Sequence, residues 1–289
     1  MASNKTLLTT LPTAFLLVFG GTLAACGGES GSLGENTGSA EAAVTVTPDL
    51  VGTHSIRIGQ RVTTVGSIAT NALSLESGAV ANGDANINNT TTSQVRISGA
   101  TLNGNVQIAG AAPSAANGEL VNGGKITGTV TAGSATQSTL ASHTVTPGTT
   151  GITVNSGAPA VTKAAGNYAS VQVNGSTLTL TGGSFNVSSL TLNSGAKLVF
   201  DTTLGPIDVS SLGTISLNGG SVSVVGTGAV SLYSNSSASS AVVINAGVGS
   251  VPASITAPNG GVIIGSRNTV VGKVGGKDVA FDPDSNQHL

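Results

Sequence analysis

The chain has 289 residues, enough for one large domain or two ordinary ones. Only 8% of its residues are charged, against about 25% in a typical soluble domain. Its formal net charge is −2, so it has no excess of positive charge to attract nucleic acid or an anionic membrane surface. We therefore expect no nucleic-acid partner. Hydrophobic residues make up 39% and recur in short alternating runs, and no window after position 45 has helical spacing. The sequence therefore predicts an all-β fold with almost no helix.

The first 25 residues have the organisation of a secretory signal peptide. Lys5 supplies a positive start, an apolar stretch runs from Leu7 to Gly21, and small residues follow. The apolar stretch is short and is interrupted by threonines and Pro12, which disfavours a membrane span. We predict that residues 1–25 are removed on export.

The tetrad Leu23-Ala24-Ala25-Cys26 resembles the lipobox of bacterial lipoproteins. The resemblance implies cleavage before Cys26, a lipid on its sulfur and acylation of its new amine. Position 27 is Gly rather than Asp, which by the same resemblance implies sorting to the outer membrane of a Gram-negative host. Several acyl chains anchor a protein stably. Cys26 is also the only cysteine, so no intramolecular disulfide can form. The alternative is a plain signal peptide with an ordinary cysteine.

Residues 26–43 are rich in Gly, Ser and Glu and contain no apolar cluster, which predicts a flexible tether after the lipidated cysteine. Residues 44–289 form the body of the protein. From Val171 to Val279, pairs of apolar residues recur at a mean spacing of about eight residues, the length of a short strand and a turn. Gly and Asn fill the intervals, as expected of turns.

Two architectures fit such strands, a β-sandwich or barrel of hairpins and a parallel β-solenoid (β-helix). Short strands, a Val/Ile/Leu core and small polar turns favour the solenoid. The first half repeats the pattern less cleanly, as in Ile56-Arg57-Ile58 and Val95-Arg96-Ile97, and residues 111–118 and 134–148 are expected to leave the coils. With three strands and about 24 residues per coil, we expect about nine coils and a rod on the order of 45 Å long.

Residues 165–282 resemble the β-solenoid domain found in bacterial cell-surface proteins and in some type IV pilin-like accessory proteins. The pieces that match are Gly166-Asn167-Tyr168 followed by VQVNGSTLTLTGGSF, then SLTLNSGAKLVFD, SITAPNGGVIIG with its Ala257-Pro258-Asn259 turn, and NTVVGKVGGKDVAFD. The matching motifs are structural, so the resemblance implies a fold and no activity. A lipid anchor in place of a pilin helix argues against a role in a pilus.

Few residues carry the pattern of a reactive site. Asp201 and Asp208 are one strand interval apart and could form the carboxylate pair of a polysaccharide-active enzyme, but both stand where turn-capping Asp is common. Asp282 and Asp284 begin a calcium-loop pattern, which lacks Gly at its sixth position and ends at residue 289. A frayed, solvated C-terminus is the simpler interpretation. We therefore predict no catalytic residue, metal or cofactor, with Cys26 as the lipidation site.

Other polar residues show no functional spacing. His54, His143 and His288 are too scattered to suggest a zinc site. Thr-x-Thr pairs, which could form an ice-binding face, have no common period and suit ordinary strands: Thr45/Thr47, Thr129/Thr131, Thr144/Thr146 and Thr177/Thr179. The preferred function is a non-enzymatic surface protein with a structural, adhesive or assembly role and a surface polysaccharide or a protein as partner. The alternatives are an exported polysaccharide-active enzyme and a ligand- or ice-binding solenoid face.

Overall fold

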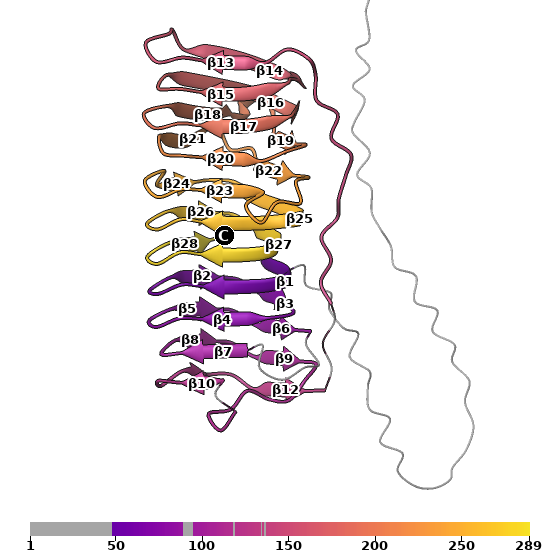
Figure 1. The fold of residues 1–289 in the computed structure, drawn as a ribbon, viewed down its shortest axis with the longest axis vertical. Helices are drawn as coiled ribbons and strands as arrows, with labels where there is room; N and C mark the ends of the chain where they lie inside the picture. The colour runs from indigo at the N-terminus through magenta and orange to yellow at the C-terminus, as the bar shows by residue number, and fades with distance from the viewer. Residues whose placement is uncertain (1–47, 89–94, 118, 134, 136) are drawn as a thin grey trace, which may run out of the picture. The chain divides into compact units, whose positions relative to one another are not determined.

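Short parallel strands wind into a β-solenoid of about 11 turns in the computed structural model of the chain, which confirms the predicted fold class (Figure 1). The structure describes residues 48–88, 95–117, 119–133, 135 and 137–289. The predicted signal peptide, Cys26 and the tether lie outside these residues. Some turns are shorter than the 24 residues expected, as where Ile68 pairs with Ala85, and the solenoid therefore has more than nine turns.

Strands β1 to β12 form the N-terminal half-solenoid. Their bounds are β1 Leu50–Ile58, β2 Thr63–Val65, β3 Ile68–Thr70, β4 Leu73–Leu75, β5 Val80–Asn82, β6 Ala85–Ile87, β7 Val95–Ser98, β8 Thr101–Asn103, β9 Val106–Ile108, β10 Leu120–Val121, β11 Lys125–Ile126 and β12 Val130–Ala132.

Strands β13 to β28 form the C-terminal half-solenoid. Their bounds are β13 Ile152–Val154, β14 Val161–Asn167, β15 Ser170–Val173, β16 Thr177–Val187, β17 Ser189–Leu192, β18 Lys197–Asp201, β19 Ile207–Ser211, β20 Ile215–Leu217, β21 Ser221–Val225, β22 Val230–Ser234, β23 Val242–Ile244, β24 Ser250–Val251, β25 Ser254–Ile264, β26 Thr269–Val271, β27 Val274–Phe281 and β28 Asn286–His288. One 3-10 turn, η1 (Thr202–Leu204), is the only helix among the described residues.

Each turn contributes to three faces, which we call A, B and C. Face A contains β3, β6, β9, β12, β19 and β22; face B contains β4, β7, β10, β13, β15, β17, β20 and β23; face C contains β2, β5, β8, β11, β18, β21, β24, β26 and β28. The longer strands bend around a corner and serve two faces: β1, β25 and β27 join A to B, and β14 and β16 join C to A. All of these pairings are parallel, as a solenoid requires.

The spatial order of the turns differs from the order of the sequence. The last strands, β27 and β28, pair with the first, β1 and β2, so that Leu50 lies opposite Val274 and Thr63 opposite Asn286. From this contact, which we call the junction, the N-terminal half-solenoid runs to one end of the rod and the C-terminal half-solenoid to the other (Figure 1). The described chain therefore begins and ends in the middle of the rod.

The connection between β12 and β13 joins the two opposite ends of the rod. Its residues 137–151, which we call the strap, run along the outside of the turns, as the pink segment at the right of Figure 1 shows. The strap contacts face A of the C-terminal half-solenoid, because the His143 ring stacks on Tyr233 and its Nε2 lies 3.0 Å from Ser210 Oγ. The expected excursion at 134–148 is thus a connection along the rod rather than a local loop.

The core follows the predicted alternation. Leu190, Leu192, Leu198 and Phe200 are each at most 1% exposed, whereas Thr191 is half-buried. Alternation along β18 predicts that Val199, between Leu198 and Phe200, points outward or to a corner; it shares its register with Thr179 and Ser223, but it is only 8% exposed. The less regular N-terminal half obeys the same rule, with Ile56, Ile58, Val95, Ile97 and their equivalents buried.

Asparagines line the corner that follows face B. A ladder of side-chain hydrogen bonds joins Asn155, Asn174, Asn193, Asn218 and Asn245 from turn to turn. Each amide can donate to one neighbour and accept from the other, so the ladder satisfies polar groups at positions where Asn also suits the turn.

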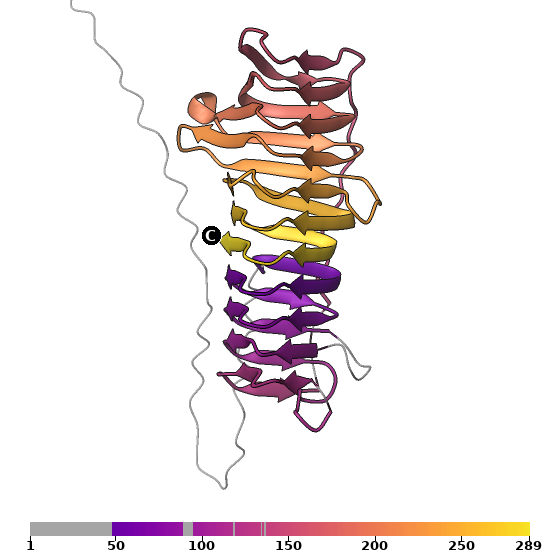
Figure 2. The same cartoon turned by 60° about the vertical axis from the view of Figure 1, so that its left-hand side comes forward.

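The two ends of the rod differ in their inward residues. At the β13–β14 end, Lys163 occupies the register position above buried Leu180, and Tyr168 packs beside Phe185 with ring centroids 6.2 Å apart. At the other end, Val130 is 36% exposed over Val106. The β13–β14 end therefore presents a lysine and a tyrosine at these positions and the β12 end an exposed valine; Figure 2 shows the course of the strands at both ends. Within the described residues, no helix has the length and apolar content that a membrane crossing needs.

Candidate functional site at the junction

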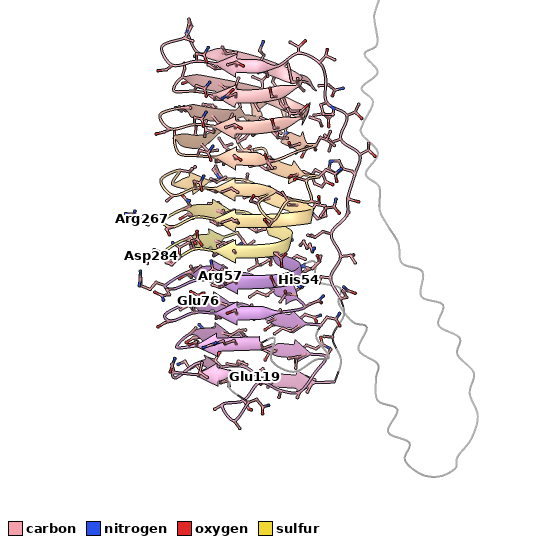
Figure 3. All side chains as sticks on the ribbon, viewed as in Figure 1. His54, Arg57, Glu76, Glu119, Arg267 and Asp284 are labelled. Carbon is pink, nitrogen blue, oxygen red and sulfur yellow. The ribbon has the colours of Figure 1, made fainter. Side chains whose placement is uncertain are left out.

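Charged residues are concentrated around the junction, in a protein that has few of them. More than half of the charged side chains that the structure describes lie on the turns from β26 to β5, and Figure 3 labels several of them near the middle of the rod. They comprise five basic and five acidic residues: Arg57, Arg61, Arg267, Lys273, Lys277, Asp49, Glu76, Asp278, Asp282 and Asp284. The two signs balance, so this region is a set of pairs rather than a patch of one charge.

Two arginines of the N-terminal half-solenoid reach carboxylates of the C-terminal half. Arg61 Nε lies 2.6 Å from Asp284 Oδ1, and its Nη2 lies 2.8 Å from Oδ2, which makes a two-pronged contact. Arg57 donates to Asp282 Oδ1 at 2.9 Å and to Glu76 Oε1 at 2.9 Å. Arg57 therefore bridges three successive turns, one of them across the junction.

Two further pairs cross the junction, one just before and one just after the segment of β1 and β27 that lies on face A. Lys273 Nζ lies 3.1 Å from Asp49 Oδ1, while Asp49 Oδ2 accepts from the backbone and hydroxyl of Ser67. His54 Nδ1 lies 2.6 Å from Asp278 Oδ1, which also accepts from Ser55 Oγ at 2.5 Å. Both carboxylates are held by donors on the opposite half, and Asp49 is also held by Ser67 on the next turn of its own half.

The pKa values of the junction carboxyls follow from these contacts. Partial burial works against ionisation of Asp49, but its hydrogen bonds with Ser67 and Lys273 outweigh burial and hold its pKa below the usual value. The same balance lowers the pKa of Asp278, where Ser55 and His54 outweigh burial. Hydrogen bonding from Arg61 lowers the pKa of the Asp284 carboxyl. The junction is therefore built for the ionised form of its carboxylates.

Polar groups also reach the inside of the rod at the junction. Gln287 of β28 and Thr64 of β2 occupy inward positions opposite each other and are 0% and 1% exposed. Gln287 Oε1 accepts from Val65 N at 3.1 Å and its Nε2 donates to Gly272 O at 3.0 Å, whereas Thr64 Oγ1 has no partner. On face C the neighbouring inward residues are apolar, such as Val270 and Ala81. The polar layer therefore marks the contact between the halves.

The structure separates the carboxylates that the sequence suggested as a catalytic pair. Asp201 ends β18 on face C, where it accepts from the hydroxyl and the backbone of Thr203, and these bonds lower its pKa. Asp208 lies on face A and is bonded to Ser231 Oγ of the next turn. Each carboxylate is thus held by a neighbouring hydroxyl, as a turn or ladder residue would be.

The C-terminal residues are ordered, contrary to the frayed terminus expected. β28 lies between β26 and β2, and Asp282 and Asp284 pair with arginines. The prediction of a frayed C-terminus is wrong because β2, the strand on which β28 packs, lies more than 200 residues away in sequence. No group of three or more metal-binding side chains occurs among the residues that the structure describes.

The remaining candidates do not come together. His54 lies at the junction, His143 in the strap and His288 in β28 on face C. Of the Thr pairs, Thr131 lies on face A, Thr177 and Thr179 on face C and Thr144/Thr146 in the strap, so the described pairs share no face. Thr45/Thr47 and Cys26 lie outside the described residues. No local feature of the sequence signals the contact between His143 of the strap and Tyr233.

Comparison with known proteins locates one family in the C-terminal half. No curated protein and no solved structure matches the chain. A family model described as "Domain of unknown function (DUF7305)" matches residues 144–254. The match begins in the strap and ends at the first residue of β25, so it overlaps the stretch whose resemblance was seen in the sequence and excludes the junction. Residues 144–254 are therefore similar to this family of unknown function, and in this chain their strands fold as part of the β-solenoid.

Proposed function

We propose that this chain is a non-enzymatic, lipid-anchored protein of the bacterial outer membrane whose solenoid serves as a structural, adhesive or assembly module. The lipobox-like tetrad ending in Cys26 and the Gly- and Ser-rich tether support the anchor. The pilin-like relation suggested by the sequence contributes only the solenoid fold to this proposal.

The observation that carries the proposal is the place where the chain enters the rod. β1 lies between β27 and β3, in the middle of the stack, so a tether that ends at residue 43 would hold the rod near its midpoint. Both ends and the long faces are then available to partners. A rod that is tethered at one end would leave only its other end available to partners.

The outward side chains of the long faces suit the binding of a partner rather than catalysis. Outward positions of face B carry Thr153, Gln172, Thr191 and Ser216 in one register. These side chains are uncharged and offer hydrogen bonds in a row, spaced by about 4.8 Å, which suits an extended polysaccharide or protein strand. Asp201 and Asp208, in contrast, are held by hydroxyl groups on different faces and give no support to the polysaccharide-active alternative.

Cell fractionation of a Cys26→Ala variant tests the anchor. We expect the wild-type chain in the outer-membrane fraction and the variant in soluble form or as an uncleaved precursor, with Ser30→Ala in the tether as the matched control. A variant that is cleaved and still partitions wholly into the membrane contradicts the proposal.

Labelling of intact cells and a glycan-degradation assay test the role. An antibody to the solenoid should label intact cells if the module meets external partners. The Asp201→Asn/Asp208→Asn variant should match the wild type in the degradation assay, and a loss of glycan cleavage would favour the enzyme.

A further inference from the structure

The junction differs from every other contact between turns, because it joins segments that are distant in sequence. We propose that the junction also forms between two copies of this chain, so that the N-terminal half-solenoid of one copy docks on the C-terminal half-solenoid of the other. This goes beyond the proposed function and does not depend on the lipid anchor.

Each side of the junction has the features of a protected sheet edge. Without the other half, β1–β2 and β27–β28 would be free edges of parallel sheets, and natural proteins protect such edges with charges and inward polar groups. Both devices occur here: the Arg61–Asp284 and Lys273–Asp49 pairs outside, and Gln287 beside Thr64 inside. The same contacts form whether the two halves belong to one chain or to two, since each half carries one complete side of the junction.

The length of the connection between β12 and β13 opposes docking within one chain. This connection includes the strap and has 19 residues, and it joins two ends of the rod that lie about ten turn spacings, or about 48 Å, apart. A relaxed flexible chain of about 19 residues has an end-to-end distance of about 24 Å. Stretching it to twice that distance lowers the effective concentration of one half at the other by on the order of a hundredfold or more.

An exchanged dimer removes this stretch if its two rods lie antiparallel. In that arrangement, the β12 end of one rod stands beside the β13 end of the other, so each strap crosses only the width between two rods, on the order of 20 Å. The two straps become equivalent by a two-fold axis, and the assembly closes as a symmetric dimer.

The strap contacts of the single chain compete with exchange. His143 stacked on Tyr233 and buried Val145, which is 5% exposed, hold the strap along its own C-terminal half. These contacts are made by a few residues. Exchange is therefore expected after refolding at high protein concentration, where docking between two copies competes with docking within one chain.

A disulfide trap distinguishes the two arrangements. Thr63 and Asn286 are register partners across the junction, and neighbouring parallel strands place such residues within disulfide range. In the full Cys26→Ser chain, Thr63→Cys and Asn286→Cys are introduced into separate, differently tagged copies, which are mixed, refolded together and oxidised. We expect an interchain disulfide of dimer mass, in at least tenfold higher yield than in the control mixture.

The control mixture uses register partners that lie within one half. Thr162→Cys in one copy and Thr179→Cys in the other face each other in the C-terminal half-solenoid, so exchange at the junction never brings them together. A chain carrying both Thr63→Cys and Asn286→Cys shows, by its intrachain disulfide, that the pair folds and reacts.

The proposal is overturned if that double variant closes while the 63/286 mixture gives no more interchain disulfide than the 162/179 mixture. A strictly monomeric mass of the Cys26→Ser chain by light scattering, across all refolding concentrations, also overturns it.

Discussion

Arg61 and Asp284 are 223 positions apart in sequence and form a two-pronged ion pair, with Nε–Oδ1 at 2.6 Å and Nη2–Oδ2 at 2.8 Å. Arg61 has a left-handed backbone (φ 57°), as does Asp284 (φ 62°), so the same corner of two neighbouring turns presents both side chains outward. The pair therefore fixes the register of one half-solenoid on the other.

Reversal of this pair tests its role. Arg61→Asp should lower the melting temperature by up to about 3 °C, because exposed ion pairs contribute little but like charges then face each other. Arg61→Asp combined with Asp284→Arg should restore most of the loss, and Lys125→Asp, exposed in β11, is the control for charge change alone. Thermal melts in low and high salt measure the effect. A double variant no more stable than Arg61→Asp would show that the pair is not coupled.

Acid should open the junction before the rest of the rod. The pKa values of Asp49, Asp278 and Asp284 are lowered in the folded chain, so the stability they supply is present above the unfolded value of about 3.9 and is lost as pH falls through the folded values. Below about pH 4, hydrogen exchange corrected for intrinsic rates should increase in β1 and β27 while β17 and β20 stay protected. Equal loss of protection in all four strands would be the contrary result.

Gly59 provides a steric probe of the junction. A Cβ atom there would lie 2.4 Å from the carbonyl oxygen of Phe281, so the two halves must move apart to admit it. Gly59→Ala should destabilise the protein by about 1–3 kcal/mol, in the range of overpacked cores. Gly166→Ala, whose nearest neighbour would be Tyr168 at 3.7 Å, is the matched control. Chemical denaturation gives both free energies, and equal values would mean that contact at the junction is not the cause.

Core packing is tested by Phe200, whose side chain is fully buried at 0% exposure. Phe200→Ala should cost about 3–5 kcal/mol through lost burial and a cavity, and Thr191→Ser well under 1 kcal/mol. Because each turn contacts only its neighbours, protection should fall first near β16, β18 and β21. Hydrogen exchange on both variants measures this. A uniform and equal loss in the two would contradict the assignment of an inside and an outside.

The sequence by itself determined the fold class and the direction of most side chains. Alternation over two residues is a local property, so Leu190, Leu192, Leu198 and Phe200 could be assigned to the core without knowledge of any neighbour. Gly and Asn between the strands likewise report the turns, because they tolerate backbone conformations that other residues avoid.

Only the tertiary structure decided the order of the turns. The same kind of side-chain alternation stacks on any turn of similar shape, so nothing in the local pattern says that β28 pairs with β2 or that the strap runs along the outside of the rod. The signal for the junction was non-local: Arg57 and Arg61 meet Asp282 and Asp284 only after the chain has formed both halves. Taken alone, the two aspartates looked like a loop end, because the charges that explain them lie at the other end of the described chain.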